Sequence, residues 1–355
     1  MPALSLVHWY TRHPSRPSPP PLDDASHVTL IGNGNVSLDV ARILLSCPAT
    51  LSKYDVPQPV LDTLSRSAIK HVSIIGRRGP FEAAFAVKEL REMMNLSEAS
   101  LAPLAPQLLN SPPDGRLSRQ QTRIMQLLKS GSKNTFGSTR KTWSLDFFRS
   151  PTGLSPPSAT RPSVVLNLDH TTVDPTTRRA VPTGETSTLT TSLVITSLGF
   201  RAEPTAPFYD PALGHLRVIA GRVASTSGTT LRNVYASGWT ATGAKGVLAS
   251  TMMDAYAVAE TIVSDWLPKG TMPPAQVNGN GGVPALARSI MCPDPHPEDP
   301  PPEILAGLEE GSVIEYSDWK VIDAEETRRG ELMGKERERM DWEEARTFLA
   351  SRRQG

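Results

Sequence analysis

The stretch His27-Val-Thr-Leu-Ile-Gly-Asn-Gly-Asn-Val-Ser-Leu-Asp39 decides the class of fold. An apolar run ends at Gly32 and a helical pattern begins at about Asn35, which predicts a strand, a tight turn and a helix N-terminus. Gly32 permits the turn, and Gly34 lets the backbone approach a pyrophosphate, whose oxygens the free N–H groups of the helix would bind. Ser37 stands in place of the usual third glycine and is small enough for close packing of helix and strand.

A second β-rich run, His71-Val-Ser-Ile-Ile75, is followed at once by Gly76-Arg-Arg-Gly79. In a dinucleotide-binding fold the end of the second strand meets the adenosine ribose, where an acidic residue selects NAD and arginine pairs with the 2′-phosphate of NADP. Arg77 and Arg78 therefore favour NADP, and a solvated arginine pair is the alternative. The two elements are further apart than the usual spacing of about twenty residues. We interpret the excess, Ser46–Ala68, as an insertion after the first helix.

A series of short motifs runs through most of the chain. They are Gly32–Leu45, Gly76–Pro80, Val87–Met93, Phe147–Pro151, Thr196–Phe200, Ala236–Thr240, Gly246–Asp254 and Tyr316–Glu326. In this order they resemble the mitochondrial adrenodoxin reductase family, whose members are NADPH–ferredoxin reductases that use FAD. The resemblance implies an α/β fold with a Rossmann-like NADP-binding domain and the C-terminal part of an FAD-binding domain, as in flavoproteins with two dinucleotide-binding domains.

The resemblance implies an NADP-binding domain over residues 1–202 and the C-terminal portion of an FAD-binding domain over 203–355. The second part contains a Pro/Gly-rich linker, 269–302, and a charged tail. The family's flavin domain begins with its own Gly-rich βαβ unit, and we find no second such fingerprint. Asn278-Gly-Asn-Gly-Gly282 follows no strand and is interpreted as linker. We therefore expect a chain that lacks the N-terminal FAD-binding segment, either a truncated product or a module that works with a separate flavin half.

The candidate NADP site begins with the turn residues Asn33, Gly34, Asn35 and Val36, which are expected to cradle the pyrophosphate. By resemblance, Glu89 touches the ribose or amide region of NADP. From the sequence alone, the turn could be purely structural, and Glu89 could be a solvated helix charge.

By resemblance, Trp239 and the helix start Gly246-Val247-Leu248 contact FAD, and Gly246 also lies near NADP. A helix N-terminus would stabilise the negative charge of reduced flavin, and a glycine there leaves room for stacking. The alternative is a core tryptophan beside a helix cap. We name no catalytic side chain, because hydride transfer depends on the alignment of two rings.

Arg119 and Arg123 lie four residues apart on a predicted helix and share one face. The family docks an acidic [2Fe–2S] ferredoxin on basic residues in a comparable region, so the resemblance implies a docking role for this pair. An ordinary solvated basic face is the alternative. The histidines do not pair at metal-ligand spacing, and no metal site is predicted.

The composition excludes several classes of function. The net charge of +1 gives no electrostatic case for nucleic-acid binding, and no apolar run is long enough to span a bilayer. The two cysteines, Cys47 and Cys292, cannot form a CxxC pair or hold an iron–sulfur cluster. The start of the chain lacks the pattern of a transit peptide. By family, the location is the mitochondrial matrix side, with peripheral association with the inner membrane left open.

The leading functional hypothesis is an NADPH:ferredoxin (adrenodoxin-type) oxidoreductase, which passes a hydride from NADPH to FAD and then single electrons to a [2Fe–2S] ferredoxin. One alternative is an NADP-binding fragment without reductase activity. Another is an NADPH oxidoreductase related to the small subunit of glutamate synthase, which the lack of cysteine clusters disfavours. The pattern further predicts helices over 83–94, 119–129 and 246–266, strands over 164–168 and 193–196, and a hairpin over 216–223.

Overall fold

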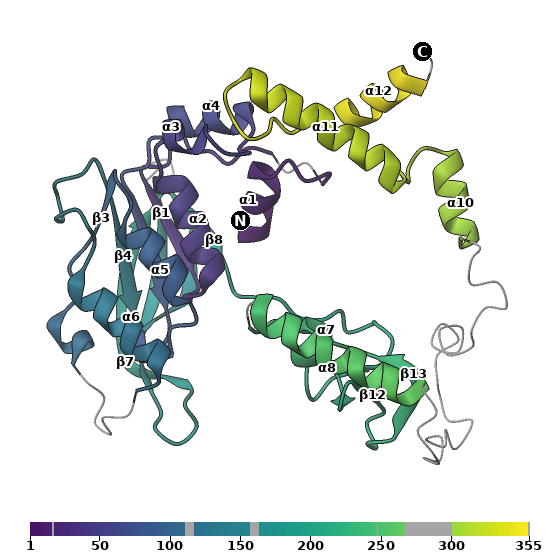
Figure 1. The fold of residues 1–355 in the computed structure, drawn as a ribbon. Helices are drawn as coiled ribbons and strands as arrows, with labels where there is room; N and C mark the ends of the chain where they lie inside the picture. The colour runs from purple at the N-terminus through teal and green to yellow at the C-terminus, as the bar shows by residue number, and fades with distance from the viewer. Residues whose placement is uncertain (16–17, 111–116, 157–162, 247, 267–299, 354–355) are drawn as a thin grey trace. The chain divides into compact units, whose positions relative to one another are not determined.

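The computed structural model describes residues 1–15, 18–110, 117–156, 163–246, 248–266 and 300–353 (Figure 1). The chain divides into two compact units: Met1–Leu198 together with Ile314–Gly355, and Gly199–Val313. The first boundary lies close to the expected division between residues 202 and 203. The C-terminal segment differs from the expectation, because it belongs to the first unit and not to the second.

The centre of the first unit is a parallel five-stranded sheet in the order β3-β4-β2-β1-β8. Strands β1 and β2 pair in register, with His27 opposite His71 and Ile31 opposite Ile75. Because parallel strands end at the same edge, this register brings the residues after Ile31 and those after Gly76 together. The strands are β1 (His27–Ile31), β2 (His71–Gly76), β3 (Ala99–Leu101), β4 (Lys141–Phe147) and β8 (Leu193–Thr196).

The two faces of this sheet are covered by different layers. Leu30 and Ile74 belong to the main core with residues of α2 (Asn35–Leu45), α5 (Val87–Met94) and α6 (Arg119–Ser130). Ile31 and Ile75 point the other way and pack with Leu166. That second layer is the antiparallel sheet of β5 (Arg149–Ser155), β6 (Val164–Val173) and β7 (Ala180–Thr191). Near-continuous apolar strands are typical of such a doubly covered parallel sheet.

Short elements complete the first unit. Helix α1 (Ala3–Tyr10) buries Ala3, Leu6 and Trp9 in the main core. The expected insertion contains two helices, α3 (Pro48–Leu51) and α4 (Gln58–Arg66). Two 3₁₀ turns, Pro80–Glu82 and Pro106–Leu109, precede α5 and α6 respectively.

The predicted helix over 83–94 is four residues too long, since α5 begins at Val87. The backbone N–H of Ala84 donates to the carbonyl of Asn33, and that of Ala86 donates to the Asn35 side chain. These long-range bonds hold the segment extended where its local pattern predicts helix. The predictions of helix over 119–129 and of strands at 164–168 and 193–196 are confirmed.

The C-terminal helices α11 (Tyr316–Leu332) and α12 (Trp342–Arg353) form a small core of their own. Polar contacts join them to the inserted segment. Lys335 Nζ donates to the carbonyl of Val56 at 2.6 Å, and Arg339 pairs with Asp55. These contacts explain why the segment belongs to the first unit.

Within its described residues, 199–246, 248–266 and 300–313, the second unit contains two small sheets and three helices. The predicted hairpin is present, with β11 and β12 joined at Ala220–Gly221, and the predicted long helix is α8, which buries Val258. The linker predicted for 269–302, including Asn278–Gly282, lies almost entirely outside the described residues. The elements are β9 (Tyr209–Asp210), β10 (His215–Leu216), β11 (Val218–Ile219), β12 (Arg222–Ala224), β13 (Thr230–Tyr235), α7 (Trp239–Thr242), α8 (Leu248–Trp266) and α10 (Pro302–Glu309).

Among the residues with described positions, no helix is both long and apolar enough to cross a bilayer. Within the same residues, no cluster of three or more histidine, cysteine or carboxylate side chains forms a metal site.

Candidate functional site

The first part of the site is the turn between β1 and α2. Gly32 adopts a φ of +124°, and a Cβ there would overlap the carbonyl oxygen of Ser197. The hydroxyl of Ser37, which replaces the third glycine, donates to the Gly32 carbonyl at 2.5 Å. The turn therefore requires glycine at position 32, and the hydrogen bond from Ser37 closes it.

Gly34 differs from Gly32 in what surrounds it. It precedes α2 in an extended conformation, with φ −127° and ψ 179°. A Cβ at Gly34 would meet no atom of the chain within 4 Å. The first N–H groups of an α-helix lack partners within the helix, and in α2 these include the N–H groups of Asn35 and Val36, which directly follow Gly34. The arrangement suits a phosphate group, which a helix N-terminus stabilises through these N–H groups and its positive dipole end.

Asn33 and Asn35 join this turn to the loop that precedes α5. The carbonyl of Asn33 accepts the N–H of Ala84 at 3.1 Å, and Asn35 Oδ1 accepts the N–H of Ala86 at 2.6 Å. The Asn35 side chain therefore holds the loop that precedes α5. This contact does not use the backbone N–H of Asn35, which stays available for a phosphate group.

Arg77 and Arg78 follow β2 at the sheet edge where the Gly32 turn lies. Arg77 is exposed and Arg78 is half-buried. Their backbone carbonyls are fixed, since Thr171 Oγ1 donates to Arg77 O at 2.8 Å. In the described part of the chain, no carboxylate pairs with either guanidinium.

Three arginines from other adjacent pairs, Arg178, Arg328 and Arg329, are neutralised by carboxylates. Arg178 pairs with Glu82 at 2.7 Å, and both Arg328 and Arg329 pair with Glu325 at 2.8 Å. These hydrogen bonds lower the pKa of Glu325 to about 2. Arg77 and Arg78 differ from these three arginines because neither guanidinium is paired with a carboxylate of the described residues, so both can bind an anion.

Two buried acceptors near the turn lack hydrogen-bond partners among the described residues. They are Asn33 Oδ1 and Glu89 Oε2. Glu89 lies in the first turn of α5 and is close enough to Asp39 to act on its charge. Burial raises the pKa of Asp39, while its ion pair with Arg42 acts in the opposite direction. Because an unsatisfied buried acceptor is costly, these atoms fit a ligand that donates N–H or O–H groups.

The residues at this edge therefore fit NADP(H). The open space at Gly34 and the helix N-terminus suit a pyrophosphate. The free Arg77 and Arg78 suit the 2′-phosphate, and the orphaned acceptors of Asn33 and Glu89 suit ribose hydroxyls or a carboxamide.

The residues expected to contact FAD belong to the second unit. Trp239 is half-exposed and stacks on Phe200, with ring centroids 5.9 Å apart and 28° between the planes. Gly246 has a φ of +91°, and Leu248 begins α8 with its side chain 90% exposed. Val247 lies outside the described residues. The exposed rings and helix start suit the ring system of a flavin.

The candidate docking residues Arg119 and Arg123 are both exposed on α6. A capping box between Ser118 and Gln121 begins this helix. Gln121 Nε2 also donates to the Phe81 carbonyl at 2.8 Å, which fixes the helix start against the segment after β2. The structure thus presents the two guanidiniums on one rigid face.

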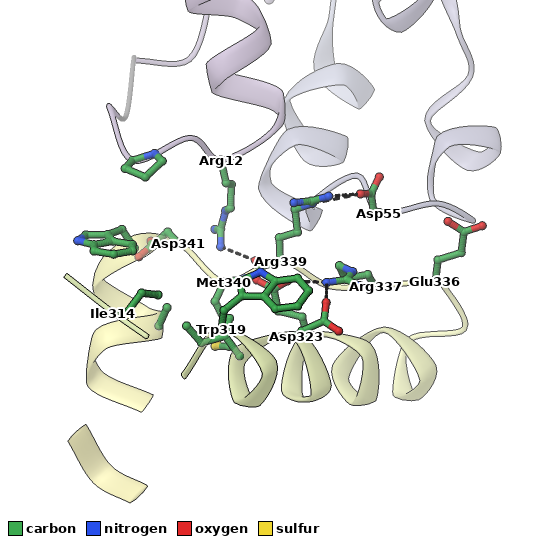
Figure 2. A pocket seen from close by; sticks show the side chains of 15 residues that line it. Arg12, Asp55, Ile314, Trp319, Asp323, Glu336, Arg337, Arg339, Met340 and Asp341 are labelled. Carbon is green, nitrogen blue, oxygen red and sulfur yellow. Dashed lines mark hydrogen bonds and ion pairs between the residues drawn. The ribbon is translucent and has the colours of Figure 1, made fainter. Parts of the chain in front are cut away.

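A cavity of about 810 Å³ lies elsewhere in the first unit, between Arg12, Asp55 and the C-terminal helices (Figure 2). None of its lining residues is a candidate site residue. Arg337 pairs with Asp323 and Arg339 pairs with Asp55, so these lining charges are already matched (Figure 2). The candidate dinucleotide site is instead an open edge of the sheet.

Two residues of the candidate site were not predicted. Phe200 and Asp254 both lie within motifs that carry the family resemblance, yet neither receives a role from the sequence. Phe200 is next to Trp239 in space, and Asp254 bonds the turn before Trp239. Neither contact has a local sequence signal, because the partners are far apart along the chain.

The fold is that of an α/β protein with a candidate site for an NADP-type dinucleotide, and comparisons with known proteins identify its family. No protein-family model matches the chain. It is 33% identical over 359 residues to the mitochondrial NADPH:adrenodoxin oxidoreductase of Bos taurus, covering 95% of this chain and 66% of that protein. The Arabidopsis thaliana protein of the same name is 30% identical, with 96% of this chain and 70% of the relative covered.

The chain belongs to the NADPH:adrenodoxin oxidoreductase family. Among solved structures, Mycobacterium tuberculosis FprA in complex with NADPH matches with a TM-score of 0.74 and 27% identity. That match covers 98% of this chain and 72% of FprA. The predicted family and fold class are confirmed. The chain spans about 66% of the length of the bovine relative.

Proposed function

We propose that the protein is an NADPH-dependent flavoprotein oxidoreductase that delivers electrons to a [2Fe–2S] ferredoxin. The observation that carries the proposal is the junction of the Gly34 turn with the unpaired Arg77 and Arg78 at one sheet edge. Membership in a family whose relatives are named NADPH:adrenodoxin oxidoreductase supports the same reaction.

In this proposal the first unit binds NADPH. The N–H groups over Asn35 and Val36 hold the pyrophosphate, and the guanidiniums of Arg77 and Arg78 hold the 2′-phosphate. Asn33 and Glu89 accept hydrogen bonds from the ribose or carboxamide through their unpartnered oxygens. These contacts orient the nicotinamide end of the molecule.

FAD, when bound, supplies the step from two-electron to one-electron chemistry. Trp239 and the start of α8 at Gly246 and Leu248 would contact its ring system. The N-terminal end of α8 would favour the negative charge that develops there on reduction. A Cβ at Gly246 would lie 2.6 Å from Ser250 Oγ, so glycine fits this position before the helix.

An acidic ferredoxin is the proposed acceptor, docked on the face of α6 that presents Arg119 and Arg123. Charge steers such encounters and high salt weakens them. The double charge reversal Arg119→Glu with Arg123→Glu is expected to slow ferredoxin reduction at least about 10-fold at low salt. Unchanged ferredoxin reduction at low salt would exclude this face. The mitochondrial names of the relatives support a mitochondrial location for the proposed reaction.

A second candidate function is NADP(H) binding without reductase activity. It is favoured by one observation: within the described residues, β1 is the strand of the parallel sheet that leads through a positive-φ glycine, Gly32, directly into a helix with a glycine N-cap. A relation to the small subunit of glutamate synthase receives no support from the adrenodoxin-type relatives.

The visible spectrum of the purified chain with added FAD tests the proposal. A bound-flavin spectrum that bleaches on addition of NADPH supports the reductase, with Arg77→Ala/Arg78→Ala as the matched control that should bleach far more slowly. Absence of bound flavin, with NADPH binding intact, supports the second candidate.

A further inference from the structure

A hydrogen bond ties the middle of α8 to the turn that precedes Trp239. Asp254 Oδ2 accepts the backbone N–H of Gly238 at 2.6 Å. The contact spans sixteen residues of sequence and lies in a partly buried position within the second unit.

The backbone at Gly238 is shaped for this contact. Its φ of 61° and ψ of −144° disfavour residues with a side chain, and a Cβ would lie 3.1 Å from Thr251 Cγ2. Thr251 and Asp254 are one helical turn apart, so both face the turn. The turn is therefore held closely against one face of α8.

Gly238 is also the N-cap of helix α7. Its carbonyl accepts the N–H groups of Ala241 and Thr242, both at 3.0 Å, and the Thr242 hydroxyl at 3.0 Å. With four residues, α7 is too short to be stable alone. The position of Trp239, its first residue, therefore depends on how Gly238 is held.

The side chain of Trp239 has few contacts of its own. Its side chain is 50% exposed, and its ring contact is the stack on Phe200, itself 47% exposed. A half-exposed stack restrains a ring much less than a packed core does. The far end of α7 is held by Ala241, which packs with Val223 and Val234, while the bond to Asp254 joins the residue before Trp239 to the helix that begins at Leu248.

We propose that Asp254 is a positioning residue, which holds Trp239 in register with the start of α8 so that both contact one flavin ring. This inference rests on the proposed function. The role is geometric, because the acceptor atom must lie where the Gly238 N–H points, and the charge of Asp254 is secondary.

Three substitutions separate geometry from charge. Asp254→Asn keeps an acceptor oxygen at the same place without the charge. Asp254→Glu keeps the charge but moves the acceptor by one methylene, and Asp254→Ala removes both. Asp265→Ala is the matched control on the same helix, since Asp265 pairs with Arg222 and Tyr235 instead of Gly238.

FAD affinity, measured by fluorescence titration, is the first readout. We expect Asp254→Ala to weaken FAD binding roughly 10-fold and Asp254→Glu roughly 3-fold, with Asp254→Asn and Asp265→Ala close to the unsubstituted protein. In a Trp239→Phe background the loss caused by Asp254→Ala should shrink, because the two residues act through one contact. Binding of NADPH should not change.

The emission of Trp239 is the second readout and needs no flavin. Subtracting the spectra of matched Trp239→Phe variants isolates it, and iodide quenching reports its exposure. Asp254→Ala and Asp254→Glu should shift this difference spectrum, and Asp254→Asn should not. A protein that binds no FAD would defeat the proposed function, while this spectrum would still test the positioning role.

The inference is overturned if Asp254→Glu behaves as the unsubstituted protein while Asp254→Asn fails, since charge would then matter more than geometry. It is equally overturned if Asp254→Ala leaves both FAD affinity and Trp239 emission unchanged. If Asp254→Ala does not fold, the comparison of Asp254→Glu with Asp254→Asn decides.

Discussion

The side-chain oxygen of Asn35 accepts a hydrogen bond from the backbone N–H of Ala86 at 2.6 Å. This contact joins the turn after β1, the candidate phosphate site, to the loop after β2. The two loops that form the candidate NADP site are therefore one connected structure, and Glu89 follows immediately on α5.

Replacing Asn35 with alanine should loosen the second loop. Because the Ala86 N–H loses its acceptor, its hydrogen exchange should speed up, and the Kd for NADPH should rise about 10-fold. Asn134→Ala is the control, since Asn134 braces a different loop through the carbonyls of Leu96 and Ala99. Equal effects of both substitutions on NADPH binding would contradict a specific role for Asn35.

Gly32 and Gly34 should respond differently to alanine. Gly32→Ala places a Cβ against the Ser197 carbonyl at a φ of +124°, so we expect a loss of several degrees in Tm. Gly34→Ala meets no protein atom, so the fold should keep its Tm while NADPH binding falls. Thermal unfolding and calorimetry on the two variants check this. NADPH binding that survives Gly34→Ala would show that the phosphate lies elsewhere.

His71 should make the fold sensitive to acid. Burial lowers the pKa of His71 to about 4, and its ring nitrogens lie 2.7 Å from Thr142 Oγ1 and 3.2 Å from Ser144 Oγ. Between the ordinary pKa of 6.5 and about 4 the unfolded chain binds more protons, so stability falls as the pH falls through this window.

Thermal unfolding between pH 7.5 and pH 4.5 measures this effect. His71→Gln should reduce the acid-dependent loss of Tm, and His27, whose pKa burial also lowers, should account for part of the remainder. An identical pH profile for the unsubstituted protein and His71→Gln would exclude His71 as the source.

The C-terminal helices should depend more on Lys335 than on Asp55. The Lys335 side chain is 2% exposed and contacts both Val56 O and Glu338, so its replacement by alanine leaves buried acceptors unpaired. We expect Lys335→Ala to lower the free energy of unfolding by about 3 kcal/mol. Asp55 is 44% exposed in its pair with Arg339, and Asp55→Ala should cost under about 1 kcal/mol.

Limited proteolysis at the start of α11 and chemical denaturation measure the two effects. The ranking would be contradicted if Asp55→Ala released the C-terminal helices as readily as Lys335→Ala.

Local patterns in the sequence predicted the parts of the fold that depend on local chemistry. The Gly32 turn, the helix that ends at Leu45 and the strand that begins at His71 are all present. Each is predicted by turn residues or apolar periodicity among residues that are close together in the sequence. The strand pairing then follows from topology, which is why Arg77 and Arg78 could be assigned to the same edge as Gly34.

Long-range contacts account for what the sequence did not predict. The extended segment before Val87 is held by Asn33 and Asn35, which lie 51 residues from their partners Ala84 and Ala86. Strand β3 is three residues long and exists through its pairing with β4. The C-terminal helices join the first unit through contacts such as Arg339 with Asp55, which are 284 residues apart. None of these has a local pattern.

Calorimetric titration with NADPH and NADH tests the central claim most directly. Two unpaired guanidiniums that meet a 2′-phosphate should make NADPH bind at least about 100-fold more tightly than NADH. Arg77→Ala/Arg78→Ala should remove that preference while leaving NADH binding unchanged, and Arg178→Ala, which loses an arginine already paired with Glu82, should keep it. Equal affinities of the unsubstituted protein for NADPH and NADH would contradict the assignment of this edge as an NADP site.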